Sequence, residues 1–153
     1  METVIAPVSS YKKTNLKIAF IGCLALAVWF AYDGYFNKSF IAKFTNEDGT
    51  PKDTLVFNQK APIVFVAASL LAAFRLFVVK DRKVTADDEG IVVNGKEKIP
   101  YNSIKKVDKT WYQQKGYFDI EYDTGEGQTS TRISRKHYDN LDAVIEKLTA
   151  KLS

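Results

Sequence analysis

Hydrophobic and polar residues are distributed differently in the two halves of the chain. Before Lys80 the sequence contains two long, nearly uninterrupted apolar runs, and after Lys80 it contains short segments in which apolar and charged residues alternate between turns. Long apolar runs are typical of membrane-spanning helices, whereas a period of two is typical of β-strands. The pattern therefore predicts an α+β membrane protein, in which a transmembrane helical hairpin is followed by a small antiparallel β domain.

The first apolar run extends from Leu16 to Tyr32, and its one charged residue, Lys17, lies near its start. A helix of about 17 residues is roughly 25 Å long, which is close to the lower limit for crossing a bilayer. Aromatic residues crowd the far end of the run, as they do at membrane interfaces. We therefore predict an N-terminal segment at residues 1–15 and a first transmembrane helix at residues 16–36. No small-x-small cleavage site follows, so a cleaved signal peptide is the less favoured alternative.

The second apolar run, Ala61–Val79, predicts a second transmembrane helix, with Pro62 in its first turn, where a helix tolerates proline. Arg75 lies inside this run, about one turn from Lys80. Its long side chain is able to snorkel to the membrane interface, and a functional buried charge is the less favoured alternative. Small side chains allow helices to approach closely in lipid. We predict that they form a helix-packing seam at Ala68, Ser69, Ala72 and Ala73.

Basic residues are dense on the outer flanks of the two runs and more widely spaced between them. The dense flanks consist of Lys12, Lys13 and Lys17 on one side and Lys80, Arg82 and Lys83 on the other. The positive-inside rule therefore predicts that both termini are cytoplasmic and that residues 37–60 form an extracytoplasmic loop. In this loop "SFIAKF" and "TLVF" flank a turn, and they either pair as a small hairpin or lie along the membrane surface.

Residues 80–153 are predicted to form a β domain that ends in one helix. The runs "RKVTA", "IVV" and "EKIPY" predict three strands, with Pro100 keeping the third at an edge or at its own end. The alternating run "GYFDIEYD" and the run "TSTRIS" predict two more strands around a glycine-rich turn. Apolar residues then recur at steps of three and four, which predicts an amphipathic helix whose stripe covers the strands. The stripe consists of Leu141, Val144, Ile145, Leu148 and Leu152.

The segments "VTADDEGIVVNGKEKIPYNSIKKVD" and "GYFDIEYDTGE", followed by the final helix, resemble the bacterial pleckstrin-homology-like (PH-like) domain. An Ile-Pro-Tyr-x-x-Ile-x-x-Val run after a glycine turn, here residues 99–107, is common in that family, as is a position directly after one or two membrane spans. The resemblance covers roughly the second half of the chain. It implies a curled antiparallel sheet capped by the helix, no shared catalytic residues and, with the predicted topology, localisation in a bacterial inner membrane.

Charge and composition exclude several classes of function. The net charge is +4, but residues 80–153 carry fourteen Lys and Arg against thirteen Asp and Glu, which is not the balance of a nucleic-acid-binding domain. One cysteine and one histidine leave no internal disulfide and no Cys or His cluster for a metal. Ser134, His137 and Asp139 lie close in sequence, but no nucleophile motif surrounds them. We therefore predict a protein that is not an enzyme, with no cofactor, no metal and no specific small-molecule substrate.

The candidate binding residues lie in and after the "SIKKVDKTW" segment. Lys105, Lys106, Lys109 and Trp111 form its basic and aromatic cluster, which suits contact with a lipid headgroup or a protein partner. A solvated face is the alternative that we favour for the lysines. The PH domains that bind phosphoinositides place basic residues in the first hairpin loop, where this chain has the acidic run "DDEG" at residues 87–90. That departure argues against phosphate binding there.

These features together predict a non-catalytic, membrane-anchored scaffold or accessory subunit of a larger integral-membrane complex, for example a respiratory or photosynthetic one. Its partners would be other integral-membrane subunits and the lipid bilayer, with no nucleic acid. The alternative is a peripheral sensor of anionic lipid headgroups, which would bind them through the PH-like domain.

Overall fold

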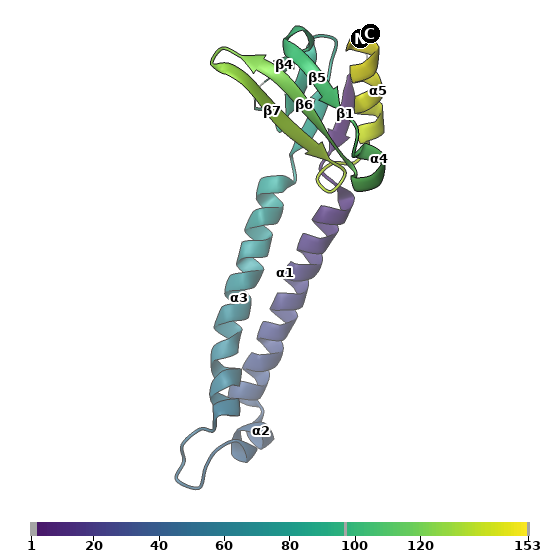
Figure 1. Ribbon diagram of the computed structural model, residues 1–153. Coiled ribbons are helices and arrows are strands. Elements are labelled where there is room, and N and C mark those ends of the chain that lie inside the picture. The colour runs from purple at the N-terminus through teal and green to yellow at the C-terminus, as the bar shows by residue number, and fades with distance from the viewer. Residues whose placement is uncertain (1–2, 97, 153) are drawn as a thin grey trace. The chain divides into compact units, whose positions relative to one another are not determined.

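The computed structural model describes residues 3–96 and 98–152 (Figure 1). The chain divides into two compact units. The β unit comprises Met1–Lys13 and Val78–Ser153, and the helical unit comprises Thr14–Phe77. The N-terminal residues therefore belong to the same unit as the second half of the chain, although the whole helical unit separates them in sequence.

The helical unit contains two long helices. Helix α1 (Ser10–Ala31) continues into a π-helical turn, η1 (Tyr32–Phe36), and after the short helix α2 (Lys38–Lys43) the chain forms α3 (Asp53–Val79). The helical stretch from residue 10 to residue 36 and helix α3 contain 27 residues each, and both are long and apolar enough to cross a membrane. A helix of this length measures roughly 40 Å, so both exceed the hydrocarbon thickness of a bilayer.

Both helices begin earlier than the apolar runs do. The first turn of α1 is held by Asp139, whose Oδ2 accepts hydrogen bonds from the Ser10 backbone N–H at 2.8 Å and the Ser10 hydroxyl at 2.9 Å. Helix α3 has Asp53 in its first turn, where a carboxylate stabilises the helix N-terminus. Pro62 consequently lies in the interior of α3, so its prediction as a first-turn residue is wrong.

The connection between the long helices contains a short helix. A β-hairpin was one of the two alternatives that the sequence left open for this connection. "SFIAKF" forms α2, whose first turn is capped by Asn37 through a 3.2 Å hydrogen bond from the Phe40 N–H to Asn37 Oδ1, and "TLVF" lies inside α3. The hairpin alternative is therefore wrong. Local capping decides the outcome, because a side-chain oxygen at the N-cap stabilises a short helix that periodicity alone does not indicate.

Helices α1 and α3 pack against each other through small and aromatic side chains. Ser69 Oγ donates a hydrogen bond of 3.2 Å to the Phe20 carbonyl, and the Phe30 ring contacts the rings of Phe57 and Phe65 at centroid distances of 5.5 Å. Near the loop end, the Tyr35 hydroxyl donates to the Gln59 carbonyl at 2.9 Å. The contacts pair early α1 with late α3 and late α1 with early α3, so the two helices run antiparallel.

The first sheet of the β unit has four antiparallel strands in the order β1-β2-β3-β4. They are β1 (Val4–Pro7), β2 (Lys83–Ala86), β3 (Gly90–Val93) and β4 (Lys98–Pro100). Pro100 ends β4, as predicted, and a 3-10 turn, η2 (Tyr101–Ser103), follows it. The sequence predicts a separate N-terminal segment at residues 1–15, whereas in the structure its first part is an edge strand of this sheet.

The second sheet has three antiparallel strands in the order β5-β6-β7. These are β5 (Ile104–Asp108), β6 (Tyr117–Thr124) and β7 (Gly127–Ser134), with the short helix α4 (Tyr112–Lys115) between the first two and helix α5 (Leu141–Leu152) at the end. A register shift between Ile104 and Lys106 marks a bulge in β5. Figure 1 shows α5 beside β1, which agrees with the contacts between the two elements.

Both sheets and α5 enclose one hydrophobic core. Side chains from β1 to β4, from β6 and β7 and from α5 meet in it. Of the predicted stripe on α5, three residues are buried, Ile145 is half-buried and Leu152 is 41% exposed at the chain end. The core members with at most 1% exposure include Ala6, Val84, Ile91, Phe118, Ile120, Ile133, Leu141, Val144 and Leu148. The predicted α+β composition, with two long apolar helices and small antiparallel sheets, is therefore confirmed.

Candidate interaction surfaces

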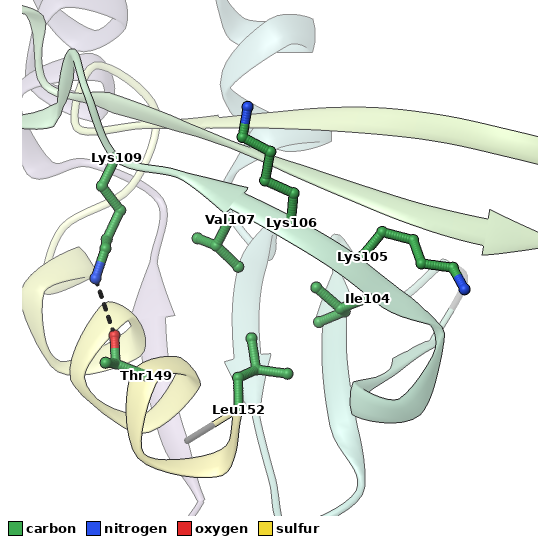
Figure 2. Close-up of a pocket in the computed structure, with 7 residues that line it drawn as sticks. All are labelled: Ile104, Lys105, Lys106, Val107, Lys109, Thr149 and Leu152. Atoms are coloured by element: carbon green, nitrogen blue, oxygen red, sulfur yellow. Dashed lines mark hydrogen bonds between the residues drawn. The ribbon is translucent and has the colours of Figure 1, made fainter.

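A groove lies between β5 and the C-terminal end of α5 (Figure 2). It has a volume of about 360 Å³. Ile104 and Val107 of β5 and Leu152 of α5 point toward one another across it, whereas Lys106 points away from α5. Because β5 is at one end of its sheet, no strand of that sheet covers its outer edge in the part of the chain that the structure describes. The β5–α5 groove is formed by Ile104, Lys105, Lys106, Val107, Lys109, Thr149 and Leu152.

The groove brings together the three lysines that the sequence singles out, and each of them has a partner in the β unit. Lys105 Nζ lies 2.9 Å from Asp123, Lys106 Nζ lies 3.8 Å from Asp108, and Lys109 Nζ donates to Thr149 Oγ1 at 3.2 Å. Two of the three positive charges are therefore offset by nearby carboxylates. The pairs are surface-exposed and stabilise the fold little, so the lysines remain able to exchange partners.

Trp111 is not part of the groove lining. It precedes α4 as its N-cap residue, its side chain is 42% exposed, and Lys115 Nζ lies 4.0 Å from its ring centroid. The sequence groups Trp111 with the three lysines, whereas in the structure it belongs to the start of α4. Its amphipathic ring, stacked under a cation, is of a kind found both at protein interfaces and at membrane surfaces.

The acidic run at residues 87–90 is tied to the rest of the β unit. Lys98 Nζ lies 3.1 Å from Asp87 and 2.6 Å from Glu89, and Asp88 accepts from Lys147 at 3.4 Å and from Lys151 at 3.2 Å. The backbone N–H of Glu89, the Lys98 ammonium and the N–H of Gly90 lower the pKa of Asp87 to about 2. These carboxylates connect the β2–β3 turn with β4 and α5, so the turn has a structural role.

The small residues of α3 divide between two faces. Ser69 and Ala72 are buried, Ala73 is half-buried, and Ala68 is exposed. The first two therefore lie on the face that meets α1, while Ala68 lies outside that contact. Arg75 is exposed on α3. Its predicted snorkelling stays a prediction.

A basic pocket lies where the two segments of the β unit meet. Its lining consists of Val8, Lys12, Arg82, His137 and Tyr138, around a volume of about 210 Å³. The chain segments are joined there by backbone hydrogen bonds, from the Val8 N–H to the Arg82 carbonyl at 3.0 Å and from the Ser9 N–H to the His137 carbonyl at 2.8 Å. A neighbouring cavity of about 670 Å³ also includes His137 and adds Lys136. Sequence reasoning did not identify this pocket, because its lining residues come from three distant segments.

His137 lines both the basic pocket and the neighbouring cavity. Partial burial of the imidazole, followed by the positive charges of Lys12, Lys136 and Arg82, lowers the pKa of His137. The catalytic grouping of this histidine with Ser134 and Asp139 finds no support in the side-chain contacts. Ser134 Oγ accepts a hydrogen bond from the Lys136 N–H, and the Asp139 carboxylate binds Ser10. Within residues 3–96 and 98–152, no group of three or more His, Cys, Asp or Glu side chains is placed to hold a metal ion.

No protein-family model, no curated protein and no solved structure matches this chain.

Proposed function

We propose that this chain is a non-catalytic accessory subunit of an integral-membrane complex. The helical hairpin spans the membrane, and the β unit is a cytoplasmic PH-like domain that contacts other subunits. The observation that carries the proposal is the large apolar surface that the hairpin leaves uncovered. Ile63 is 73% exposed, Trp29 68%, Phe77 66% and Leu70 64%. Contiguous apolar surfaces of this kind mark a membrane or protein contact, because in water they favour association.

The topology of the β unit supports a hairpin with both ends on one side of the membrane. Strand β1 precedes α1, strand β2 follows α3, and the two strands pair with each other. Two spans inserted between paired strands return the chain to the side on which it started. The lysines that flank the hairpin on this side favour the cytoplasm, by the positive-inside rule.

Support for the PH-like assignment comes from the element order. The β unit has sheets of four and three antiparallel strands and one C-terminal amphipathic helix. This arrangement agrees with the curled sheet and covering helix that the sequence resemblance implies. Support for protein contact comes from the β5–α5 groove, because an edge strand beside a partly apolar groove is a geometry that accepts an extended peptide segment.

Two experiments test the accessory role. In the first, membranes of the native host are solubilised gently and the mass of the particle that contains this chain is measured. A particle much heavier than the 17.3 kDa chain with its detergent is expected. In the second, a photo-crosslinking amino acid replaces Leu70 on the uncovered face of α3, and a control carries it at Glu47 in the loop before α3. Adducts with an integral-membrane protein are expected from Leu70 and not from Glu47. A chain that remains monomeric and yields no adduct contradicts the proposal.

A sensor of headgroups that uses Lys105, Lys106 and Lys109 has less support than the accessory role. Each of these lysines already contacts Asp123, Asp108 or Thr149. A headgroup would have to compete with those partners, and the groove between the lysines is partly apolar.

A further inference from the structure

We propose that the basic pocket binds the headgroup of an anionic phospholipid in the leaflet that the hairpin enters. Lys12, Arg82 and His137 of this pocket, together with Lys136 of the neighbouring cavity that shares His137, would surround the negatively charged headgroup. The inference rests on membrane insertion of the hairpin, as proposed above, and adds a lipid site that is separate from the β5–α5 groove.

The first support is the concentration of positive charge without compensating carboxylates. Among residues 3–96 and 98–152, no Asp or Glu side chain lies within ion-pair distance of Lys12, Arg82 or Lys136. Asp139, three residues after Lys136, binds Ser10 at the start of α1, and Asp81, next to Arg82, has a side chain that is 85% exposed and lies 4.0 Å from Lys80 Nζ. Several other basic residues of the β unit do have a carboxylate partner.

Arg132, for example, forms a two-point pair with Asp119 at 2.8 and 2.9 Å, and Lys98 pairs with the β2–β3 turn. Several cations of the β unit are therefore placed against carboxylates, whereas Lys12 and Arg82 line the basic pocket and Lys136 lines the neighbouring cavity. Lysine and arginine in such a setting bind phosphate oxygens strongly, because their hydrogen bonds to an anion are charge-assisted.

The second support is the position of these residues along the chain. Lys12 lies four residues before Leu16, the first residue of the apolar run, which is about 6 Å along α1. Arg82 lies three residues after Val79, the last residue of α3, and three residues span at most about 11 Å. The polar layer of a leaflet is roughly 5–8 Å thick. The chain therefore holds both cations at the depth of the headgroups once the hairpin is inserted.

The third support is the rigidity of the pocket. Val8 and Tyr138 form an isolated bridge, and the Tyr138 hydroxyl donates to Asn94 Oδ1 at 2.8 Å. Both apolar side chains are buried, with 2% and 8% exposure, so they form a fixed wall. The cations are thus held on a preorganised frame, which lowers the entropic cost of binding a ligand.

Retention of lipid by the full-length chain tests the proposal. The chain is incorporated into nanodiscs of phosphatidylcholine with a minor fraction of phosphatidylglycerol, released into mild detergent and weighed by native mass spectrometry. The wild type is expected to retain phosphatidylglycerol, and R82Q/K136Q is expected to retain roughly tenfold less or lower still. The control K105Q/K106Q loses the same charge elsewhere on the β unit and is expected to retain as much lipid as the wild type. All four side chains are exposed, so neither variant should unfold the domain.

The single histidine of the chain supplies an independent measurement. The imidazole of His137 is titrated by NMR in nanodiscs with and without phosphatidylglycerol. We expect the anionic lipid to raise the pKa of His137 in the wild type and in K105Q/K106Q, and to raise it much less in R82Q/K136Q. Inorganic phosphate added to pure phosphatidylcholine nanodiscs is expected to leave the titration unchanged.

Three results would overturn the inference. They are equal lipid retention by both double variants, no retention by the wild type, or a response to inorganic phosphate as large as the response to the lipid. Failure of the chain to enter nanodiscs of either composition would instead refute membrane insertion. The two proposals are therefore tested separately.

Discussion

Val4 in strand β1 lies directly opposite Ala86 in strand β2, although both long helices lie between them in the chain. Ile5, Ala6 and Pro7 continue the pairing, and Ala6 is completely buried in the core of the β unit. The β unit is therefore incomplete without residues that precede the hairpin. A fragment that begins at Lys80 lacks the edge strand β1, and binding measured on such a fragment would not represent the folded domain.

The substitution A6D tests the contribution of β1. An unpaired carboxylate at a position with 0% exposure should lower the stability of the β unit by about 3 kcal/mol or more, because its charge loses water without gaining a partner. The matched control is I5D, at a neighbouring position that is 46% exposed, where a loss below about 1 kcal/mol is expected. Hydrogen exchange of the β2 amides in the full-length protein measures both. Equal protection in A6D and the wild type would show that β1 does not contribute to the domain.

The sequence was sufficient to predict the elements whose periodicity is local. Phe118, Ile120 and Tyr122 alternate with acidic residues, and they are buried in β6 as that alternation requires. The stripe of α5 was recognisable for the same reason. Strand β1 could not be predicted, because "VIAP" is too short to show a period and its partner lies far away in the chain. Long-range pairing contributes stability that no local window contains.

The candidate surfaces also differ in whether their residues are close together or far apart in the sequence. Lys105, Lys106 and Lys109 lie within five residues, so their shared location in the groove was accessible from the sequence. The basic pocket combines residues near positions 12, 82 and 137, which meet only after β1 joins β2 and the segment after β7 reaches Ser9. Its sequence signal, dense basic flanks beside the apolar runs, suggests a membrane orientation, which stays a prediction, but it does not indicate that a pocket forms.

Gly34 provides a test of the helix packing. A Cβ atom at this position would lie 2.8 Å from the Asn58 carbonyl oxygen, a group that Pro62 cannot bond because it has no N–H. We expect G34A to destabilise the hairpin by about 1–3 kcal/mol, because the backbones must separate. G22A is the control, since a Cβ there meets nothing within 4 Å. Unfolding in sodium dodecyl sulfate, followed by Trp29 fluorescence in a W111F background, measures both. Equal midpoints for the two variants would contradict the close approach.

Tyr112 connects α4 with α5 through a polar network at the edge of the core. Its hydroxyl donates to Asp142 Oδ1 at 3.0 Å and accepts from Arg135 Nε at 3.1 Å, while its ring packs against Phe118. Y112F should cost about 1 kcal/mol, because Arg135 and Asp142 keep their own 2.7 Å contact. Y112A should cost about 3–5 kcal/mol, because it also leaves a cavity. Chemical denaturation of the full-length protein in detergent separates the two, and equal losses would mean that the ring contributes nothing beyond its hydroxyl.

The lowered pKa of Asp87 implies that the β unit loses stability in acid. Hydrogen bonds from Glu89, Lys98 and Gly90 lower the pKa of Asp87 from 3.8 to about 2, so the folded protein binds this proton more weakly than the unfolded chain. The stability contributed by the ionised carboxylate is therefore fully present above about pH 4, and it is lost as the pH falls toward 2. D87N should be less stable than the wild type at pH 7 and should lack this acid-dependent step. D81N, at a side chain that is 85% exposed, should keep the step. Denaturant unfolding between pH 7 and 2 provides the measurement, and a step of equal size in D87N would assign it to other carboxylates.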